Sequence, residues 1–219
     1  MKKIIAFSLW GNNPKYTIGA LENIKAQKML FPDWSCRFYC HTGMHPSDVD
    51  KLRNVNDTVE IVLVDEIPYI CHMNSPGWFW RFNVLTDNSI DRVVIRDADS
   101  RLTQRDLNCV KDWEKSKLPF HIIRDHSLHS TRIMAGMWGA TREFINSIDY
   151  ITLLKQFDNL KYPNIYGIDQ EFLARMIYPL IKDKACIHDD WHRYSDEINV
   201  RKIPHFRDGN HFIGEPIEI

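Results

Sequence analysis

The 219-residue sequence lacks an excess of charge of either sign, and it lacks any long apolar run. It has 28 Lys and Arg against 29 Asp and Glu, without the basic excess that nucleic-acid binding usually requires. It contains no stretch of about 18 consecutive apolar residues, the length of a membrane-spanning helix. We therefore expect neither a nucleic-acid partner nor a membrane span.

Cysteine is scarce, and its spacing suits neither a disulfide framework nor a cysteine zinc site. The count is odd and no two cysteines form a C-x-x-C pair: Cys36, Cys40, Cys71, Cys109 and Cys186. The first residues, MKKIIAFSLWGNNPKY, lack the cleavage site of a signal peptide and are typical of a first strand. We expect a cytoplasmic protein with reduced thiols, in which Cys36 and Cys40 are small buried residues on one strand face.

Apolar runs alternate with helix-forming segments along the chain. Buried strands are predicted at 4–10, 37–41, 59–64, 92–95 and 120–123, and short strands in the tail beyond 185. Helices are predicted at 14–30, with Asn13 as its cap, and at 46–55, 77–85 and 167–177. Two more helices are predicted to begin after Thr103, which can cap the first of them, and after Thr141. This order predicts one α/β domain over residues 1–219, with a mainly parallel central sheet flanked by helices.

The most informative segment is Val93-Val-Ile-Arg-Asp-Ala-Asp-Ser-Arg101, in which a hydrophobic strand ends in two aspartates. Asp97 and Asp99 are two residues apart, so their side chains face the same way on an extended chain. Ligands of open α/β sheets bind beyond the carboxyl ends of strands, where carboxylates suit Mg²⁺ or Mn²⁺ shared with phosphates. The alternative is a helix-capping loop in which the acids pair with neighbouring arginines: Arg96, Arg101 or Arg105.

Three further segments accompany this Asp-Ala-Asp motif: Trp80-Arg81-Phe82, Gly167-Ile-Asp169-Gln170 and His211-Phe-Ile-Gly214. Together they resemble the nucleotide-sugar glycosyltransferases of the GT-A type, and the last two resemble motifs of the glycogenin-like members. The chain departs from those members in having Glu215-Pro216 where they have Lys-Pro-Trp, which removes an expected lysine contact to the diphosphate.

The sequence most resembles the small glycosyltransferase domains of large algal viruses. The segments that carry this likeness cover much of the chain as far as Gly139: Phe7–Gly11, Asn13–Gly19, Arg96–Leu102, Phe120–His126 and Gly136–Gly139. The resemblance implies a metal-dependent transferase in viral glycan synthesis. It implies a nucleotide-sugar donor, expected to be a UDP-hexose, and an acceptor hydroxyl on a glycan or other molecule. A metal-dependent hydrolase and a non-catalytic nucleotide- or sugar-binding module are the alternatives.

The resemblance implies a site for Mn²⁺ or Mg²⁺. Asp99 is expected to bind the ion, and Asp97 to bind it through water or to contact the ribose. His211 is the expected third ligand, since neutral imidazole tolerates Mn²⁺; its alternative is a solvated surface residue.

Donor-binding residues are expected around the first strand and the aromatic helix. Ser8, Trp10 and Tyr16 are candidates for the uracil–ribose pocket, although Trp10 fits core packing equally well. Arg81 is expected to contact a phosphate or the aspartate turn, because a guanidinium grips two oxygens at once. Its alternative is a pairing with an acid at the sheet edge or stacking on aromatic rings.

Two later segments are expected to face the sugar. In the predicted loop 136–139, Gly136 permits close approach of the backbone and Trp138 offers an apolar face, unless Trp138 is a core residue. Asp169 is the catalytic candidate, as a hydrogen-bond partner of donor-sugar hydroxyls or a base for the acceptor hydroxyl. Capping of the late helix alone also explains an aspartate there, so inversion or retention stays open.

Histidine is abundant in the second half of the chain. His188 and His192 have a spacing that permits zinc binding, but no third ligand is apparent and polar loop contacts are expected instead. His121, His126 and His129 are likewise weak indications of zinc, although His126 is expected to reach the substrate.

Overall fold

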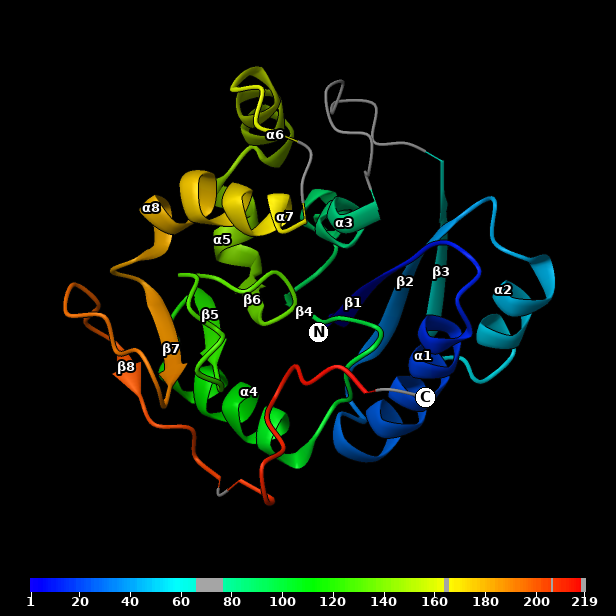
Figure 1. Ribbon diagram of the computed structural model, residues 1–219, viewed down its shortest axis with the longest axis horizontal. Coiled ribbons are helices and arrows are strands. Elements are labelled where there is room, and N and C mark those ends of the chain that lie inside the picture. The colour runs from blue at the N-terminus through cyan, green and yellow to red at the C-terminus, as the bar shows by residue number, and fades with distance from the viewer. Residues whose placement is uncertain (66–76, 164–165, 206, 218–219) are drawn as a thin grey trace.

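The computed structural model describes residues 1–65, 77–163, 166–205 and 207–217, which form an eight-stranded sheet with helices on both faces (Figure 1). The strands are β1 (Lys3–Leu9), β2 (Ser35–His41), β3 (Val59–Val64), β4 (Arg92–Ile95), β5 (Phe120–Arg124), β6 (Trp138–Thr141), β7 (Ala185–Asp189) and β8 (Val200–Arg201). They are ordered β3-β2-β1-β4-β6-β5-β7-β8. Only β6 among these strands is antiparallel to its neighbours, which confirms the predicted mainly parallel α/β sheet.

Alternating side chains of β1 face two separate hydrophobic layers. Ile5 and Phe7 pack in the layer covered by α1 (Pro14–Leu30), α2 (Pro46–Arg53) and α4 (Gln104–Ser116). Ile4 and Ala6 pack in the opposite layer. That layer is covered by α3 (Gly77–Trp80), the 3₁₀ turn η1 (Arg81–Thr86), α5 (Arg142–Ser147), α6 (Tyr150–Asn159), α7 (Ile168–Phe172), the π turn η2 (Leu173–Ile177) and α8 (Tyr178–Ile181). Both faces of the central strands are therefore buried, as their unbroken apolar runs predicted.

The predicted helix starts are confirmed in their capping geometry. The side chain of Asn13 accepts a hydrogen bond from Lys15 N at 3.0 Å, with Pro14 in the first turn of α1. The Thr103 hydroxyl accepts from Asp106 N at 3.1 Å and begins α4.

Two elements differ from the sequence prediction. The predicted loop 136–139 is in part strand β6, which pairs with both β4 and β5. Its four residues, WGAT, carry too little pattern to be read as a strand. Helix α6 was not predicted, because its apolar residues follow closely on the helix predicted after Thr141.

Cys36 and Cys40 are buried and free, which confirms the prediction for these two residues, and Cys109 and Cys186 are buried and free as well. Cys71 lies outside the described residues. Among the described helices, none combines the length and the apolar character needed to span a bilayer.

The strand order places a switch point between β1 and β4. From β1 the chain proceeds to β2 and β3 on one side, and then crosses to β4 on the other side. Crevices outside the carboxyl ends of strands at such a point are where open α/β sheets bind ligands. Trp10 and Asp97 follow β1 and β4 at this edge, so the fold itself indicates where a site would lie.

Candidate active site

A cavity of about 380 Å³ opens at the carboxyl ends of β1 and β4, within the size range of small-molecule sites. Later segments at 126–137, 166–170 and 212–216 contribute the rest of its wall. Most of the predicted site residues line this one cavity: Trp10, Tyr16, Arg81, Asp97, Asp99, Gly136 and Asp169. The fold therefore brings these residues, which are distant in the sequence, together at one edge of the sheet.

The aspartate turn is held tightly against helix α1. A Cβ added to Gly19 would lie 2.0 Å from the carbonyl oxygen of Ala98, so only glycine permits this approach. Asn23 Nδ2 donates to the carbonyl oxygen of Ser100 at 2.8 Å, and Leu102 N donates to Asn23 Oδ1 at 2.9 Å. These contacts fix the backbone that carries the two carboxylates.

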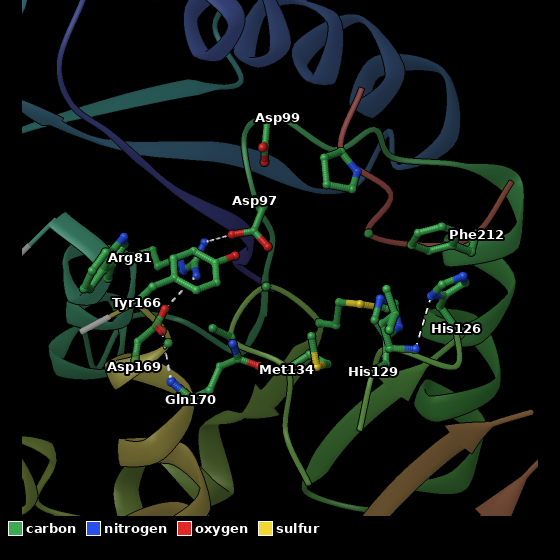
Figure 2. A pocket seen from close by; sticks show the side chains of 18 of the residues that line it. Arg81, Asp97, Asp99, His126, His129, Met134, Tyr166, Asp169, Gln170 and Phe212 are labelled. Atoms are coloured by element: carbon green, nitrogen blue, oxygen red, sulfur yellow. Dashed lines mark hydrogen bonds and ion pairs between the residues drawn. The ribbon is translucent and has the colours of Figure 1, made fainter. Parts of the chain in front are cut away.

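Arg81 lies between two acids of the cavity (Figure 2). Its guanidinium binds Asp97 Oδ1 and donates to Asp169 Oδ2 at 3.2 Å, while its backbone N donates to Ser8 Oγ at 2.9 Å. The expected contact between Arg81 and the aspartate turn is thus confirmed. Ser8 does not line the cavity; it is buried and positions the residue that does.

Asp99 is paired with a lysine rather than with an arginine. Lys15 Nζ, from the first turn of α1, lies 3.1 Å from Asp99 Oδ2. The alternative pairing of the acids with neighbouring arginines is not observed among the described residues. Arg96 instead binds Asp106, and Arg105 binds Asp125.

Asp169 is an almost completely buried carboxyl in the first turn of α7. Capping does not explain Asp169, because Gly167 occupies the N-cap with φ +87° and Asp169 Oδ1 accepts from Gln170 N, the next residue of the helix. Burial raises the pKa of Asp169, and the nearby charge of Asp97 adds to this, whereas Arg81 opposes it. The carboxyl therefore favours a proton more than an exposed aspartate does.

Gly136 is required by the aspartate that it faces. A Cβ at this position would lie 1.9 Å from Asp97 Oδ2, so a side chain here would displace the carboxylate. The expectation for Trp138 is wrong: it is fully buried, and its ring stacks on Phe120 with centroids 5.3 Å apart. Because Trp138 lies within β6, its ring points into the core and only the residues before it reach the cavity.

Two aromatic rings line the cavity beside β1. Trp10 and Tyr16 lie nearly parallel, at 17°, with centroids 6.4 Å apart. Trp10 is 40% exposed, which excludes the core alternative for this residue. A flat pair beside the aspartate turn, with Trp10 exposed and Tyr16 half-buried, is suited to stacking with a planar ligand.

The opposite end of the cavity is formed by His126, His129 and Phe212 (Figure 2). The rings of His126 and Phe212 stack with centroids 4.2 Å apart. His126 Nδ1 accepts from Leu128 N at 3.2 Å, and His129 Nδ1 accepts from Asp125 N at 3.1 Å. In the neutral form both rings therefore carry their proton on Nε2.

His129 is held in that neutral form, since burial lowers its pKa to about 4. His126 was singled out from the sequence, but His129 was not. Their spacing of three residues, which places both side chains on one turn, was the available signal.

The carboxy-terminal segment runs along the cavity between Asp125 and the aspartate turn. Asp125 Oδ2 accepts from Ile213 N at 3.0 Å, and Ile217 N donates to the carbonyl oxygen of Asp99 at 2.9 Å. The predicted ligand His211 does not line the cavity, however. Its side chain is 78% exposed and its Nδ1 is 2.8 Å from Glu215 Oε2, a hydrogen bond that raises the pKa of His211. The structure therefore does not bring His211 to the two aspartates, and Phe212 is the residue of this segment that faces inward.

The two aspartates fit a hard divalent cation. Arg81 binds one oxygen of Asp97 and Lys15 binds one oxygen of Asp99, so each carboxylate keeps an oxygen that makes no hydrogen bond within the described residues. Carboxylate oxygens, completed by water and phosphate oxygens, are the ligands that Mg²⁺ and Mn²⁺ prefer.

A second cluster, of Asp112, Cys186 and His188, has its candidate ligand atoms within 4.8 Å of one another. Arg201 NH1 lies 2.8 Å from the Asp112 carboxylate, and the His188 ring bonds both Asp112 and His121. These groups already satisfy one another. The expected polar contacts of His188 are thereby confirmed, and they lie in a buried network rather than a loop.

No protein-family model matches the chain, and no curated protein matches it. Solved structures do match. A glycosyltransferase involved in the glycosylation of the major capsid of PBCV-1 aligns with a TM-score of 0.50 and 13% identity, over 86% of this chain and 82% of that chain. The galactosyltransferase LgtC, with donor and acceptor sugar analogs, aligns with a TM-score of 0.57 and 14% identity, over 86% of this chain and 73% of that chain.

The mannosyltransferase PcManGT from Pyrobaculum calidifontis, in complex with GDP-Man and Mn²⁺, aligns with a TM-score of 0.53 and 14% identity, over 91% of this chain and 55% of that chain. These similarities show the fold. The chain has the GT-A architecture of these glycosyltransferases, as the sequence motifs predicted.

Proposed function

We propose that the chain is a metal-dependent glycosyltransferase, a single domain over residues 1–219, that transfers a hexose from a UDP-hexose to a hydroxyl group of a glycan or other acceptor. One observation supports this most. Asp97, Asp99, Arg81 and Asp169 share one cavity at the switch point of a GT-A sheet. The fold supports the class of enzyme, and these side chains would supply groups that the reaction needs.

Asp97 and Asp99 would hold Mn²⁺ or Mg²⁺, through the carboxylate oxygens that no described residue binds. Bound there, the ion would supply a Lewis acid for the departing nucleoside diphosphate. His211, turned toward Glu215, has no part in this proposal. Arg81 holds Asp97 in place and keeps a fixed positive charge beside the position where negative charge develops.

The two ends of the cavity suggest where each substrate binds. The Trp10–Tyr16 pair would stack on the uracil ring, and Gly136 would allow the donor sugar to approach the backbone. The opposite end offers two imidazole Nε2–H donors and the ring of Phe212, which suit the hydroxyl groups and apolar face of an acceptor sugar.

Asp169 lines the cavity beside Arg81 and is the proposed chemical group. As a carboxylate it would accept a proton from the acceptor hydroxyl, or a hydrogen bond from a donor-sugar hydroxyl. Its raised pKa, caused by burial, makes it a stronger base than an exposed aspartate. Arg81 offsets part of the cost of burying its charge.

Calorimetry with UDP, with and without Mn²⁺, tests the proposal. We expect weak binding of UDP alone and much tighter binding with the ion, and we expect Asp99→Ala to abolish that gain without unfolding the chain. Asp48→Ala, which changes an acid of α2 outside the cavity, is the control. Unchanged manganese-dependent affinity in Asp99→Ala would refute the metal assignment.

The same preparation separates the alternatives. A thermal-shift panel of nucleotide-sugars with Mn²⁺ identifies the donor. Rapid release of free sugar or phosphate, whatever acceptor is added, would indicate a hydrolase. Binding of free glycan with no need for an ion would indicate a non-catalytic module.

A further inference from the structure

Lys15 lies beside the cavity and pairs with Asp99, a carboxylate of the cavity wall. Its ammonium lies 3.1 Å from Asp99 Oδ2, and the two side chains are 26% and 20% exposed. The backbone of Lys15 is fixed, because it lies in the first turn of α1 and donates to the Asn13 cap. Its side chain has no other ion pair among the described residues, and its ammonium also lies over the Tyr16 ring, 5.9 Å from the centroid.

The charges of the cavity make Lys15 a competitor of any cation at Asp99. The acids Asp97, Asp99 and Asp169 face the cations Arg81 and Lys15. A divalent ion bound to the Asp99 carboxylate would repel an ammonium bound to the same group. The two cations would use different oxygens of Asp99, but their repulsion weakens the Lys15–Asp99 pair and favours movement of the ammonium to another anion.

The Lys15 ammonium can move away from Asp99 and bind another anion nearby. Its four-carbon chain is flexible, and an ammonium is a point charge with three donors that accepts oxygen ligands from many directions. A diphosphate that shares an ion with Asp99 brings its anionic oxygens next to this ammonium. The first turn of the 17-residue helix α1 adds a favourable potential for an anion.

We propose that Lys15 is an exchangeable counter-ion: it neutralises Asp99 in the empty site and binds the diphosphate of the nucleotide once a divalent ion occupies Asp99. This inference rests on the proposed function. In a static role, Lys15 would only stabilise the aspartate turn. In the exchange role, Lys15 weakens the binding of the divalent ion and strengthens the binding of the nucleotide.

The test is Lys15→Met, measured by calorimetry with Mn²⁺ alone and with UDP at saturating Mn²⁺. We expect Mn²⁺ alone to bind about threefold more tightly, because its competitor is gone. We expect UDP to bind about tenfold more weakly, because a charge-assisted hydrogen bond to the diphosphate is lost. Uridine, which has no phosphate, should bind equally to both proteins.

Lys25→Met is the matched control, since Lys25 lies on the same helix but pairs with Glu22 at 2.8 Å. Lys15→Arg keeps the charge and should retain most of the affinity for UDP. Thermal melting of each variant confirms that it is folded.

The outcomes separate this inference from the proposed function. If the wild-type protein binds no nucleoside diphosphate with Mn²⁺, whether UDP or GDP, the proposed function fails and the inference with it. If the wild-type protein binds UDP with Mn²⁺ but Lys15→Met changes both affinities in the same direction, or neither, only the exchange role of Lys15 is refuted.

Discussion

Replacement of Arg81 by methionine should destabilise the protein in a pH-dependent way. The Arg81 guanidinium is 7% exposed and pairs with the Asp169 carboxylate, which is 6% exposed. Methionine fills a similar volume but carries no charge, so Asp169 would be left buried without its counter-ion. Arg81 now lowers the pKa of Asp169 against the effect of burial. In the variant that pKa rises further.

The loss of stability in Arg81→Met depends on how deeply each carboxylate that Arg81 pairs with is buried. Removing one member of a buried ion pair costs about 3–5 kcal/mol. The pair with Asp97 adds little, since that side chain is 40% exposed and water screens the interaction. We therefore expect a loss of about 3 kcal/mol at neutral pH, which lowers the Tm of a chain of this size by about 6–12 °C.

Urea denaturation, followed by tryptophan fluorescence at about pH 7 and about pH 5, measures this loss. As the pH falls, the uncompensated Asp169 takes up a proton and its burial costs less, so the difference from the wild type should shrink. Arg81→Met combined with Asp169→Asn should recover most of the stability at neutral pH, because no buried charge remains. An equal loss at both pH values, with no recovery in the double variant, would refute the electrostatic account.

Three further predictions concern neighbouring parts of the molecule. Gly136→Ala places a Cβ 1.9 Å from Asp97 Oδ2, so it should weaken manganese-dependent UDP binding in calorimetry. The Tm should change little, because the displaced carboxylate is the end of a flexible side chain. Unchanged UDP binding would contradict the contact between Gly136 and Asp97. Trp138→Ala should lower the free energy of unfolding by about 3–5 kcal/mol in urea denaturation, as expected of a core aromatic residue. Trp138→Phe should leave the affinity for the donor unchanged. Weaker donor binding by a folded Trp138→Phe variant would indicate that Trp138 contacts the sugar after all. Burial lowers the pKa of His188 and of His129 to about 4. As the pH falls, the unfolded chain binds protons at these two histidines before the folded chain does, so the urea midpoint should fall between about pH 6.5 and about pH 4. A constant urea midpoint over this range would contradict the neutral state of the buried rings.

The sequence predicted the part of the fold that depends on local pattern. Central parallel strands are buried on both faces, so they appear as unbroken apolar runs, and β1 and β4 were recognisable for that reason. Their ends were equally clear, because polar residues begin where each strand leaves the core. The positions of Trp10, Asp97 and Asp99 at one edge of the sheet followed from these ends and from the parallel arrangement.

Contacts between distant segments could not be predicted. Arg81 and Asp169 are separated by 88 residues, and nothing in either segment specifies the partner of the other. Trp138 shows the same difficulty on a small scale, since a shift of one residue along a strand moves a side chain to the opposite face. A loop tryptophan beside a ligand and a strand tryptophan in the core have the same local sequence.

His211 was misjudged for a related reason. Its motif places a histidine near the aspartates, but position along the chain does not fix which side chains of a loop turn inward. In the structure the aromatic ring of Phe212 packs on His126, and the hydrogen bond to Glu215 holds His211 in solvent.

The two cations of the site reach the aspartates from opposite sides of the sheet. Arg81 belongs to η1, in the layer of α3 and α5–α8, and it is fixed by two carboxylates and by Ser8. Lys15 belongs to α1, in the other layer, and it has a single ion pair among the described residues. In the proposed function, Arg81 would hold the geometry of the site with a fixed charge, and the Lys15 ammonium would move when the nucleotide arrives. Because the aspartate turn lies where the two helical layers meet, this fold can supply one cation of each kind to neighbouring carboxylates.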